Sequence, residues 1–224
     1  MNLSTYKNNI IITDKLVIKN YSDRENFLNE VRAFELLKGS KFLPRIVEIK
    51  DMTIIFEKIS REKFINNPKE LNELFLDEIA GFISELYSIK SEKNGYLSNL
   101  SDKCNPEFLL DKLKCRLSEI VTLSDNDKES CLNYFINSKK NSEWQSSTSL
   151  LHYDLKPTNI ILVRNGLKVI DFDKASFGDV EMDIAKFFWR TLRFNGVLQE
   201  KFINKLKISV DINKINIYIF FYTA

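Results

Sequence analysis

The spacing of the apolar residues changes near residue 59, and this change constrains the fold more than any other feature of the sequence. Before it, short β-branched runs predict strands, and a helical repeat of apolar residues predicts one helix between them. Ser22, with Glu25 three residues later, is the predicted N-cap of this helix. We expect strands at residues 10–12, 16–19, 46–49 and 53–56 and the helix between Ser22 and Gly39.

Beyond residue 59, long helical patterns replace the short runs. We expect helices at residues 71–89, 108–121 and about 127–137 and from about 180 onward, a loop at 139–148, and strands at 149–151, 160–163 and 167–170. Arg164-Asn165-Gly166 joins the last two strands and is a strong hairpin signal. The sequence therefore predicts an α+β fold of two lobes, a small β-rich lobe over residues 1–59 and a larger, mostly helical lobe over 60–224. A small ligand is expected in the cleft between them.

Composition excludes several classes of protein. The 224 residues are 44% hydrophobic, which suits a globular chain, and 33 Lys+Arg against 31 Asp+Glu leave a net charge of only +2. No basic stripe with interleaved aromatic residues is visible, so we expect no nucleic-acid partner. The odd cysteine count (Cys104, Cys115 and Cys131) favours free thiols in a reducing compartment. With no signal-peptide pattern and no apolar run near 20 residues, we expect a cytoplasmic protein without membrane insertion.

Polar residues gather at both ends of the predicted hairpin. His152, Asp154 and Asn159 precede it, and Asp171 and Asp173 follow it. Asp154, Asn159 and Asp171 supply hard oxygen ligands, and one of these two carboxylates remains for another role. This set suits Mg²⁺ and a substrate that carries phosphate.

These residues resemble the protein-kinase superfamily, whose catalytic loop has the pattern His-x-Asp-x-x-x-x-Asn and is followed by a hairpin and a metal-binding Asp. The resemblance implies a two-lobed protein-kinase-like fold. It implies that Asp154 accepts the proton of the attacking hydroxyl, and that Asn159 and Asp171 hold Mg²⁺ on the phosphates of ATP or GTP. His152 would support the loop from behind.

The N-terminal lobe offers residues for the other parts of this resemblance. Lys19 ends a strand, as does the family's lysine that contacts the α- and β-phosphates. A carboxylate on the apolar face of the helix would pair with it, and Glu30 fits the family's helix better than its rival Glu35. The resemblance also implies a hinge at residues 56–59, where backbone groups of Glu57 and Ile59 would meet the adenine.

Three departures separate the chain from ordinary protein kinases. All six glycines lie beyond residue 38, so a Gly-rich phosphate loop is absent, and a turn around residues 6–9 is expected to replace it. Asp173 stands where protein kinases have Gly, and only 12 positions separate Asp171 from Asp183. Residues 170–185 instead resemble the aminoglycoside phosphotransferase and choline kinase branch, which implies that Asp183 supports the metal loop from behind. Three roles stay open for Asp173: contact with a second metal, contact with the substrate, or a solvated position in a turn.

Lys156 points in another direction, because a lysine two residues after the catalytic Asp is typical of Ser/Thr protein kinases, where it contacts the γ-phosphate. Our leading hypothesis is an ATP- and Mg²⁺-dependent phosphotransferase acting on the hydroxyl of a small molecule, such as an aminoglycoside, an amino sugar or an amino alcohol. The alternatives are a compact Ser/Thr protein kinase with a protein acceptor, and a kinase-like protein that binds nucleotide without catalysis.

Overall fold

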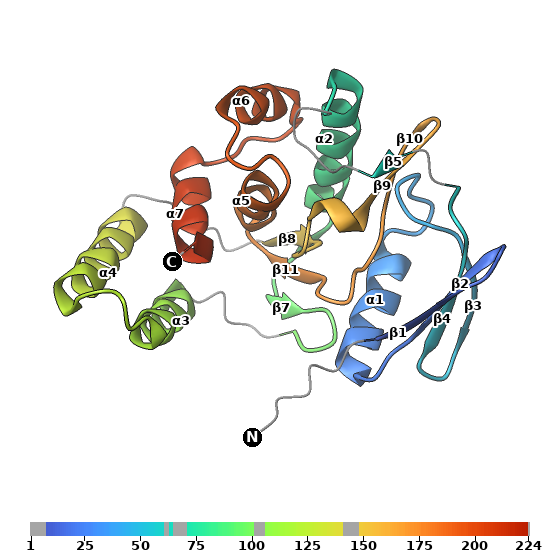
Figure 1. Cartoon of the computed structure of the whole chain (residues 1–224), viewed down its shortest axis with the longest axis horizontal. Coiled ribbons are helices and arrows are strands. Elements are labelled where there is room, and N and C mark those ends of the chain that lie inside the picture. The colour runs from blue at the N-terminus through green and yellow to red at the C-terminus, as the bar shows by residue number, and fades with distance from the viewer. Residues whose placement is uncertain (1–7, 61–62, 65–70, 101–105, 141–147, 224) are drawn as a thin grey trace.

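The computed structural model describes residues 8–60, 63–64, 71–100, 106–140 and 148–223. A β-sheet occupies the N-terminal part and helices dominate the C-terminal part (Figure 1). The predicted α+β fold class is therefore confirmed.

Four antiparallel strands form the N-terminal sheet in the order β1-β2-β4-β3. They are β1 (Asn9–Ile12), β2 (Leu16–Asn20), β3 (Ile46–Lys50) and β4 (Thr53–Glu57). The register of the two central strands pairs Lys19 with Ile54. Because cross-strand partners project from the same face of a sheet, Lys19 shares its face with Ile54 and Phe56, which are both buried.

The helix α1 (Arg24–Leu36) packs on this face of the sheet, where the ring centroids of Phe34 and Phe56 lie 5.5 Å apart. Its N-cap is Asp23, whose side chain accepts a hydrogen bond from the backbone N–H of Asn26 at 2.9 Å. The prediction of Ser22 as the N-cap was wrong by one residue. Both residue types are good caps, and the Asp carboxylate also interacts favourably with the helix dipole.

The helices of the C-terminal part are α2 (Glu73–Ser88), α3 (Pro106–Glu119), α4 (Asp125–Lys140), α5 (Val180–Arg190), α6 (Gly196–Lys205) and α7 (Ile212–Thr223). The core lies around α2 and α5, where rings such as Phe82 and Phe187 are fully buried. Of the loop predicted at 139–148, residues 141–147 lie outside the described residues, and α4 continues to Lys140.

Three strands stand where the sequence predicts them: β8 (Thr148–Leu151), β9 (Ile160–Val163) and β10 (Gly166–Val169). Gly166 has φ +129°, a conformation that other residues rarely adopt, which explains a glycine at the end of this hairpin turn. The structure adds four strands that the sequence does not predict: β5 (Lys63–Phe64), β6 (Lys90–Ser91), β7 (Gly95–Tyr96) and β11 (Ser176–Gly178). Two or three residues are too few for an alternating pattern to be visible.

The N-terminal sheet ends with β4, and the next strand, β5, pairs with β9 of the hairpin. The hairpin also contacts the segment between α1 and β3, because the N–H of Val169 donates to the carbonyl of Phe42 at 2.7 Å. The division into residues 1–59 and 60–224 stays a prediction. None of the helices in the described ranges is long and apolar enough to cross a membrane.

Candidate active site

A cavity of about 860 Å³ opens beside the N-terminal sheet and reaches the β9–β10 hairpin. Its size is that of a typical small-molecule site. Apolar side chains line one part of it, namely Ile10, Ile12, Val17, Phe56, Ile161 and Ile170. Polar side chains line another part, namely Asn8, Lys19, Glu30, Thr158, Asn159, Asp171 and Asp173. The cavity therefore offers apolar surface for a flat ring and polar groups for a charged tail.

Glu57 and Ile59, the predicted hinge residues, both belong to the lining of this cavity. The N–H of Glu57 donates to the carbonyl of Arg45 at 2.9 Å, so that the start of this segment is anchored to the residue before β3. Lys58 is fixed in the same way, because its N–H donates to the carbonyl of Lys15 at 2.8 Å. The contact of Glu57 and Ile59 with a base stays a prediction.

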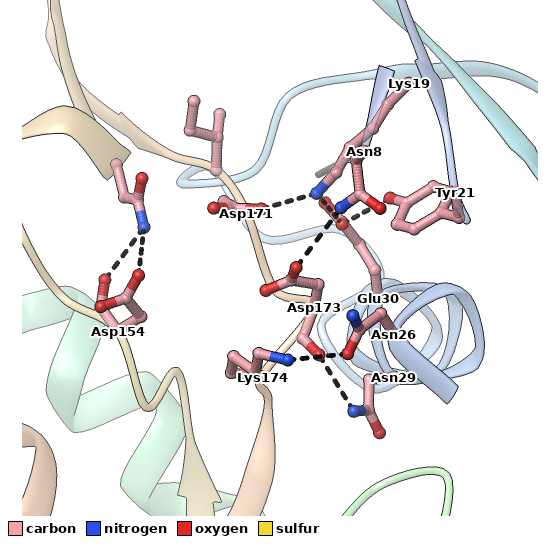
Figure 2. Close-up of polar contacts among 12 residues, drawn as sticks. Asn8, Lys19, Tyr21, Asn26, Asn29, Glu30, Asp154, Asp171, Asp173 and Lys174 are labelled. Atoms are coloured by element: carbon pink, nitrogen blue, oxygen red, sulfur yellow. Dashed lines mark hydrogen bonds and ion pairs between the residues drawn. The ribbon is translucent and has the colours of Figure 1, made fainter. Parts of the chain in front are cut away.

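Lys19 forms two ion pairs in the polar part of the cavity. Its Nζ donates to Glu30 Oε2 at 2.5 Å and to Asp171 Oδ1 at 2.6 Å, which joins β2, α1 and the segment after β10 (Figure 2). Burial alone would lower the pKa of Lys19, but the charges of Glu30 and Asp171 outweigh it and raise the pKa to about 12. Lys19 is therefore a fixed cation. The rival carboxylate, Glu35, is exposed.

Tyr21 is a member of this cluster that the sequence analysis missed. Its hydroxyl donates to Glu30 Oε2 at 2.5 Å, the same oxygen that Lys19 contacts (Figure 2). Burial, and then the negative charge of Glu30, raise the pKa of Tyr21, so the hydroxyl keeps its proton. Tyr21 lies two residues beyond Lys19, and this spacing along an extended chain, which puts both side chains on one face, is the signal that could have found it.

The segment after β8 is held by two buried side chains. His152 is fully buried, with Nδ1 accepting from the N–H of Asp154 at 3.2 Å and Nε2 lying 3.0 Å from the carbonyl of Ile170. A neutral ring with its proton on Nε2 satisfies both contacts. Burial lowers the pKa of His152 to about 4, which keeps the ring neutral. Asp183 of α5 accepts from the N–H groups of His152 and Tyr153 at 2.6 and 2.7 Å.

Lys186, one turn further along α5, also holds this segment and was not predicted. Its Nζ donates to the carbonyl of Tyr153 at 2.6 Å and lies 3.5 Å from the centre of the Tyr153 ring. Tyr153 has φ +66°, an unfavourable conformation for a side chain of this size. Asp183 and Lys186 thus fix the N–H and the carbonyl of the residue that precedes Asp154. Burial lowers the pKa of Lys186 to about 8.

Asp154, Asn159 and Lys156 form a second polar group. The Nδ2 of Asn159 donates to the backbone carbonyl of Asp154 at 3.0 Å and to its Oδ2 at 3.3 Å. Lys156 pairs directly with the same carboxylate oxygen of Asp154. The Asp154 side chain is 27% exposed, so its carboxylate remains accessible from solvent.

Asp171 is joined to Asn159 by the hairpin, because the N–H of Ile170 donates to the carbonyl of Asn159 at 3.0 Å. Asp171 has φ +71°, a strained conformation of the kind that concentrates at functional sites. Burial would raise the pKa of Asp171, but Lys19 outweighs it and lowers the pKa. Its Oδ2 has no hydrogen-bond partner within the described residues. One carboxylate oxygen is therefore available to a further ligand.

The implied Mg²⁺ would need oxygen ligands from the residues that line this cavity. Across the described ranges, no three His, Cys, Asp or Glu side chains are grouped to hold a metal by themselves. Asn159 uses its Nδ2 on Asp154, and its Oδ1 accepts only a long hydrogen bond from the Thr158 hydroxyl at 3.4 Å, so this oxygen can still bind a metal ion in the cavity that Asp171 also lines. Mg²⁺ commonly binds through one or two protein oxygens together with substrate phosphates and water. Asn159 and Asp171 fit that mode.

A polar seam, made by Asn26, Asn29 and Arg32, joins α1 to the C-terminal part. Asn29 is buried, and its Nδ2 donates to the carbonyl of Asp173 at 3.0 Å while its Oδ1 accepts from the N–H of Ser98 at 2.6 Å. Asn26 accepts from Lys174 at 2.9 Å, and Arg32 donates to the carbonyl of Leu97 (Figure 2 shows the contact of Asn26 with Lys174 and that of Asn29 with Asp173). The helix that carries Glu30 is therefore tied to the segment that carries Asp171.

Asp173 lies at the edge of the same cavity. Its Oδ2 accepts from Asn8 at 3.4 Å (Figure 2), and burial, followed by the charge of Asp171, raises its pKa to about 6. Of the turn predicted around residues 6–9 to cover phosphates, residues 6 and 7 lie outside the described residues. Asn8 lies in the cavity lining.

Known proteins are similar to this chain both in sequence and in fold. Residues 111–204 match the model of APH, the phosphotransferase enzyme family. A comparison with curated protein sequences finds no match.

Solved structures share the fold over almost the whole chain. The choline kinase LicA from Streptococcus pneumoniae is 20% identical, with a TM-score of 0.68, over 97% of this chain and 78% of that one. The ADP-bound aminoglycoside phosphotransferase APH(2'')-Ib is 16% identical, with a TM-score of 0.66, over 96% and 81%. The GDP complex of wild-type aminoglycoside 2'-phosphotransferase-IIIa is 15% identical, with a TM-score of 0.71, over 97% and 80%. The predicted resemblance to this branch and its kinase-like fold are confirmed.

Proposed function

We propose that this chain is a phosphotransferase that moves the γ-phosphate of ATP or GTP to a hydroxyl group of a small molecule with the help of Mg²⁺. The observation that carries the proposal is the convergence at one cavity of Lys19, Asn159 and Asp171, with Asp154 hydrogen-bonded to Asn159. The family match supports a phosphotransferase, and the ADP and GDP bound to the similar proteins support a nucleotide substrate.

Each group has a chemical role in this proposal. The apolar part of the cavity encloses the base, and Lys19, held by Glu30 and Asp171, binds phosphate oxygens. Bound Mg²⁺, held by Asn159 and Asp171, would neutralise charge on the phosphates. His152, Asp183 and Lys186 fix the backbone around Asp154, and the buried, neutral ring of His152 does not exchange protons.

The transfer step follows from the position of Asp154. Its carboxylate accepts the proton of the acceptor hydroxyl, and the hydroxyl oxygen forms a bond to the γ-phosphorus. The bond between that phosphorus and the β-phosphate oxygen breaks, and its electron pair stays on the nucleoside diphosphate. Because the transition state of such transfers is loose, orientation of the hydroxyl matters more than the basicity of Asp154.

The test is a panel of hydroxyl acceptors (aminoglycosides, amino sugars, and amino alcohols such as choline and ethanolamine), assayed with ATP and with GTP for release of the nucleoside diphosphate. One acceptor should give turnover that depends on Mg²⁺. Asp154→Asn should lower kcat by at least about a hundredfold while nucleotide still binds. Asp77→Asn, on the exposed surface of α2, is the matched control and should keep the parent's kcat. Equal turnover by Asp154→Asn and the parent would refute the role of Asp154.

A second candidate, a Ser/Thr protein kinase, is favoured by Lys156, which pairs directly with Asp154. Incubation with labelled ATP and cell lysate distinguishes the two, because label in protein bands supports a protein acceptor and label in small solutes supports the leading proposal. Binding of ATP without transfer to any acceptor would support the third alternative, a non-catalytic nucleotide-binding protein.

A further inference from the structure

One buried hydroxyl in the N-terminal part has no role in the reaction described above. Tyr21 is 6% exposed, and its hydroxyl donates to Glu30 Oε2 at 2.5 Å. Lys19 donates to the same oxygen at 2.5 Å (Figure 2). A single carboxylate oxygen thus accepts from a cation and from a neutral hydroxyl.

We propose that Tyr21 is a positioning residue for nucleotide binding, which fixes Glu30 so that Lys19 is held in the direction of the phosphates. This inference rests on the proposed function. A lysine ammonium has three N–H donors, and Glu30 and Asp171 occupy two of them. The third remains for a phosphate oxygen, and its direction is set by the two that are occupied.

The geometry of the cluster supports this role. Glu30 is 1% exposed, so water cannot replace a lost hydrogen bond at its carboxylate. With the hydroxyl in place, Oε2 has two donors, one from the end of β2 and one from the residue that follows β2, and together they fix the carboxylate on α1. Without it, Lys19 is the only donor to the carboxylate among the described residues, and the carboxylate can turn about this one contact. The ammonium would then be less well ordered before nucleotide binds.

The alternative is that Tyr21 only fills space, since its ring also makes an edge-on contact with Phe27 at 5.4 Å between centroids. Tyr21→Phe separates the two roles, because it removes one oxygen atom and keeps the ring. The chain offers a matched control in Tyr218, a buried tyrosine of α7 whose hydroxyl donates to Asp179 Oδ2 at 2.5 Å. Tyr218→Phe removes an equivalent hydrogen bond away from the cavity.

The experiment measures the Kd for ATP in the presence of MgCl₂ by calorimetry, together with the thermal midpoint of each variant. Tyr21→Phe should weaken binding about three- to twentyfold, which is less than the full contribution of a hydrogen bond to a charged group because Tyr21 acts on the nucleotide only through Glu30 and Lys19. Tyr218→Phe should lower the thermal midpoint by about as much as Tyr21→Phe does, because each variant loses one buried hydrogen bond. It should change the Kd less than about twofold. A Kd of Tyr21→Phe within twofold of the parent would overturn the inference.

A double-mutant cycle tests whether Tyr21 acts through Glu30. Glu30→Met has a similar length but offers Tyr21 no carboxylate, so Tyr21→Phe in that background should change the Kd less than about twofold. Multiplication of the two single effects would overturn the inference, because Tyr21 would then act independently of Glu30. A parent protein that binds neither ATP nor GTP would overturn the proposed function, whereas parent binding with an unchanged Tyr21→Phe overturns this inference alone.

Discussion

Replacement of Lys19 by methionine should separate the stability of this protein from its ability to bind nucleotide. Methionine keeps the length of the side chain but removes the charge shared by Glu30 and Asp171. The two carboxylates then differ in their access to water, since the side chain of Asp171 is 32% exposed and that of Glu30 only 2%. The loss of stability in this variant therefore comes mainly from the unpaired charge of Glu30.

The magnitude follows from this burial. Removing one partner of a buried ion pair costs about 3–5 kcal/mol of the free energy of unfolding. Glu30 keeps the hydrogen bond from Tyr21, so the lower end of that range, about 3 kcal/mol, is expected. For a chain of this size the thermal midpoint should fall by roughly 6–12 °C.

Urea unfolding followed by tryptophan fluorescence provides the assay. The double variant Lys19→Met, Glu30→Met contains no unpaired charge at Glu30 and should recover more than half of the lost free energy of unfolding. Both variants should fail to bind ATP. Lys201→Met is the matched control, because Lys201 pairs with Glu73 on the surface and its loss should leave the urea midpoint unchanged. A single variant within about 1 kcal/mol of the parent, or a double variant less stable than the single one, would refute this reasoning.

Two further predictions concern groups that hold the site in place. Asn29→Ala leaves the N–H of Ser98 and the carbonyl of Asp173 without their partner, so the free energy of unfolding should fall by about 2 kcal/mol and the Kd for ATP with MgCl₂ should rise, both more than in Asn26→Ala. Burial lowers the pKa of His152 to about 4, so the unfolded chain binds more protons between about pH 6.5 and 4 and stability is lost as pH falls through this window. Between pH 7 and 5, the free energy of unfolding of His152→Gln, measured in urea, should therefore fall by about 2 kcal/mol less than that of the parent. An equal fall in both proteins would contradict the lowered pKa.

Much of the architecture could be predicted from the sequence because its signals are local. The apolar repeats of α1, α2 and α3 and the Arg164-Asn165-Gly166 turn each lie within one element, and the structure has the corresponding elements close to the predicted positions. The error at Ser22 is of the same local kind, since two adjacent residues could serve as the N-cap. The predicted pair of Lys19 and Glu30 depended on complementary charges, which are visible in a sequence, and the structure places these two side chains in contact.

The residues that the sequence did not indicate mostly bind the backbone of distant segments. Asn29 contacts the carbonyl of Asp173 and the N–H of Ser98, and Lys186 contacts the carbonyl of Tyr153. Every residue has a backbone carbonyl, and all but proline have an N–H, so the partner of such a side chain leaves no trace in the residue types. The strand β5, which is only two residues long, could not be predicted for a similar reason, because its pairing with β9 is decided by tertiary contacts alone.

The buried charges themselves argue that this cavity exists for a ligand. A buried ion pair contributes little net stability, because the desolvation of both partners offsets their attraction, and apolar side chains of similar volume often serve the fold as well. Lys19 nevertheless connects Glu30 of α1 with Asp171 beyond β10, and Asp171 keeps one carboxylate oxygen to which no described residue donates a hydrogen bond. Folding alone gives no reason for a strained, half-satisfied carboxylate beside a fixed cation. Binding of a phosphate chain and a divalent cation gives a reason for both. The double variant Lys19→Met, Glu30→Met should be stable but unable to bind ATP, and it therefore separates the role of these charges in ligand binding from their role in folding.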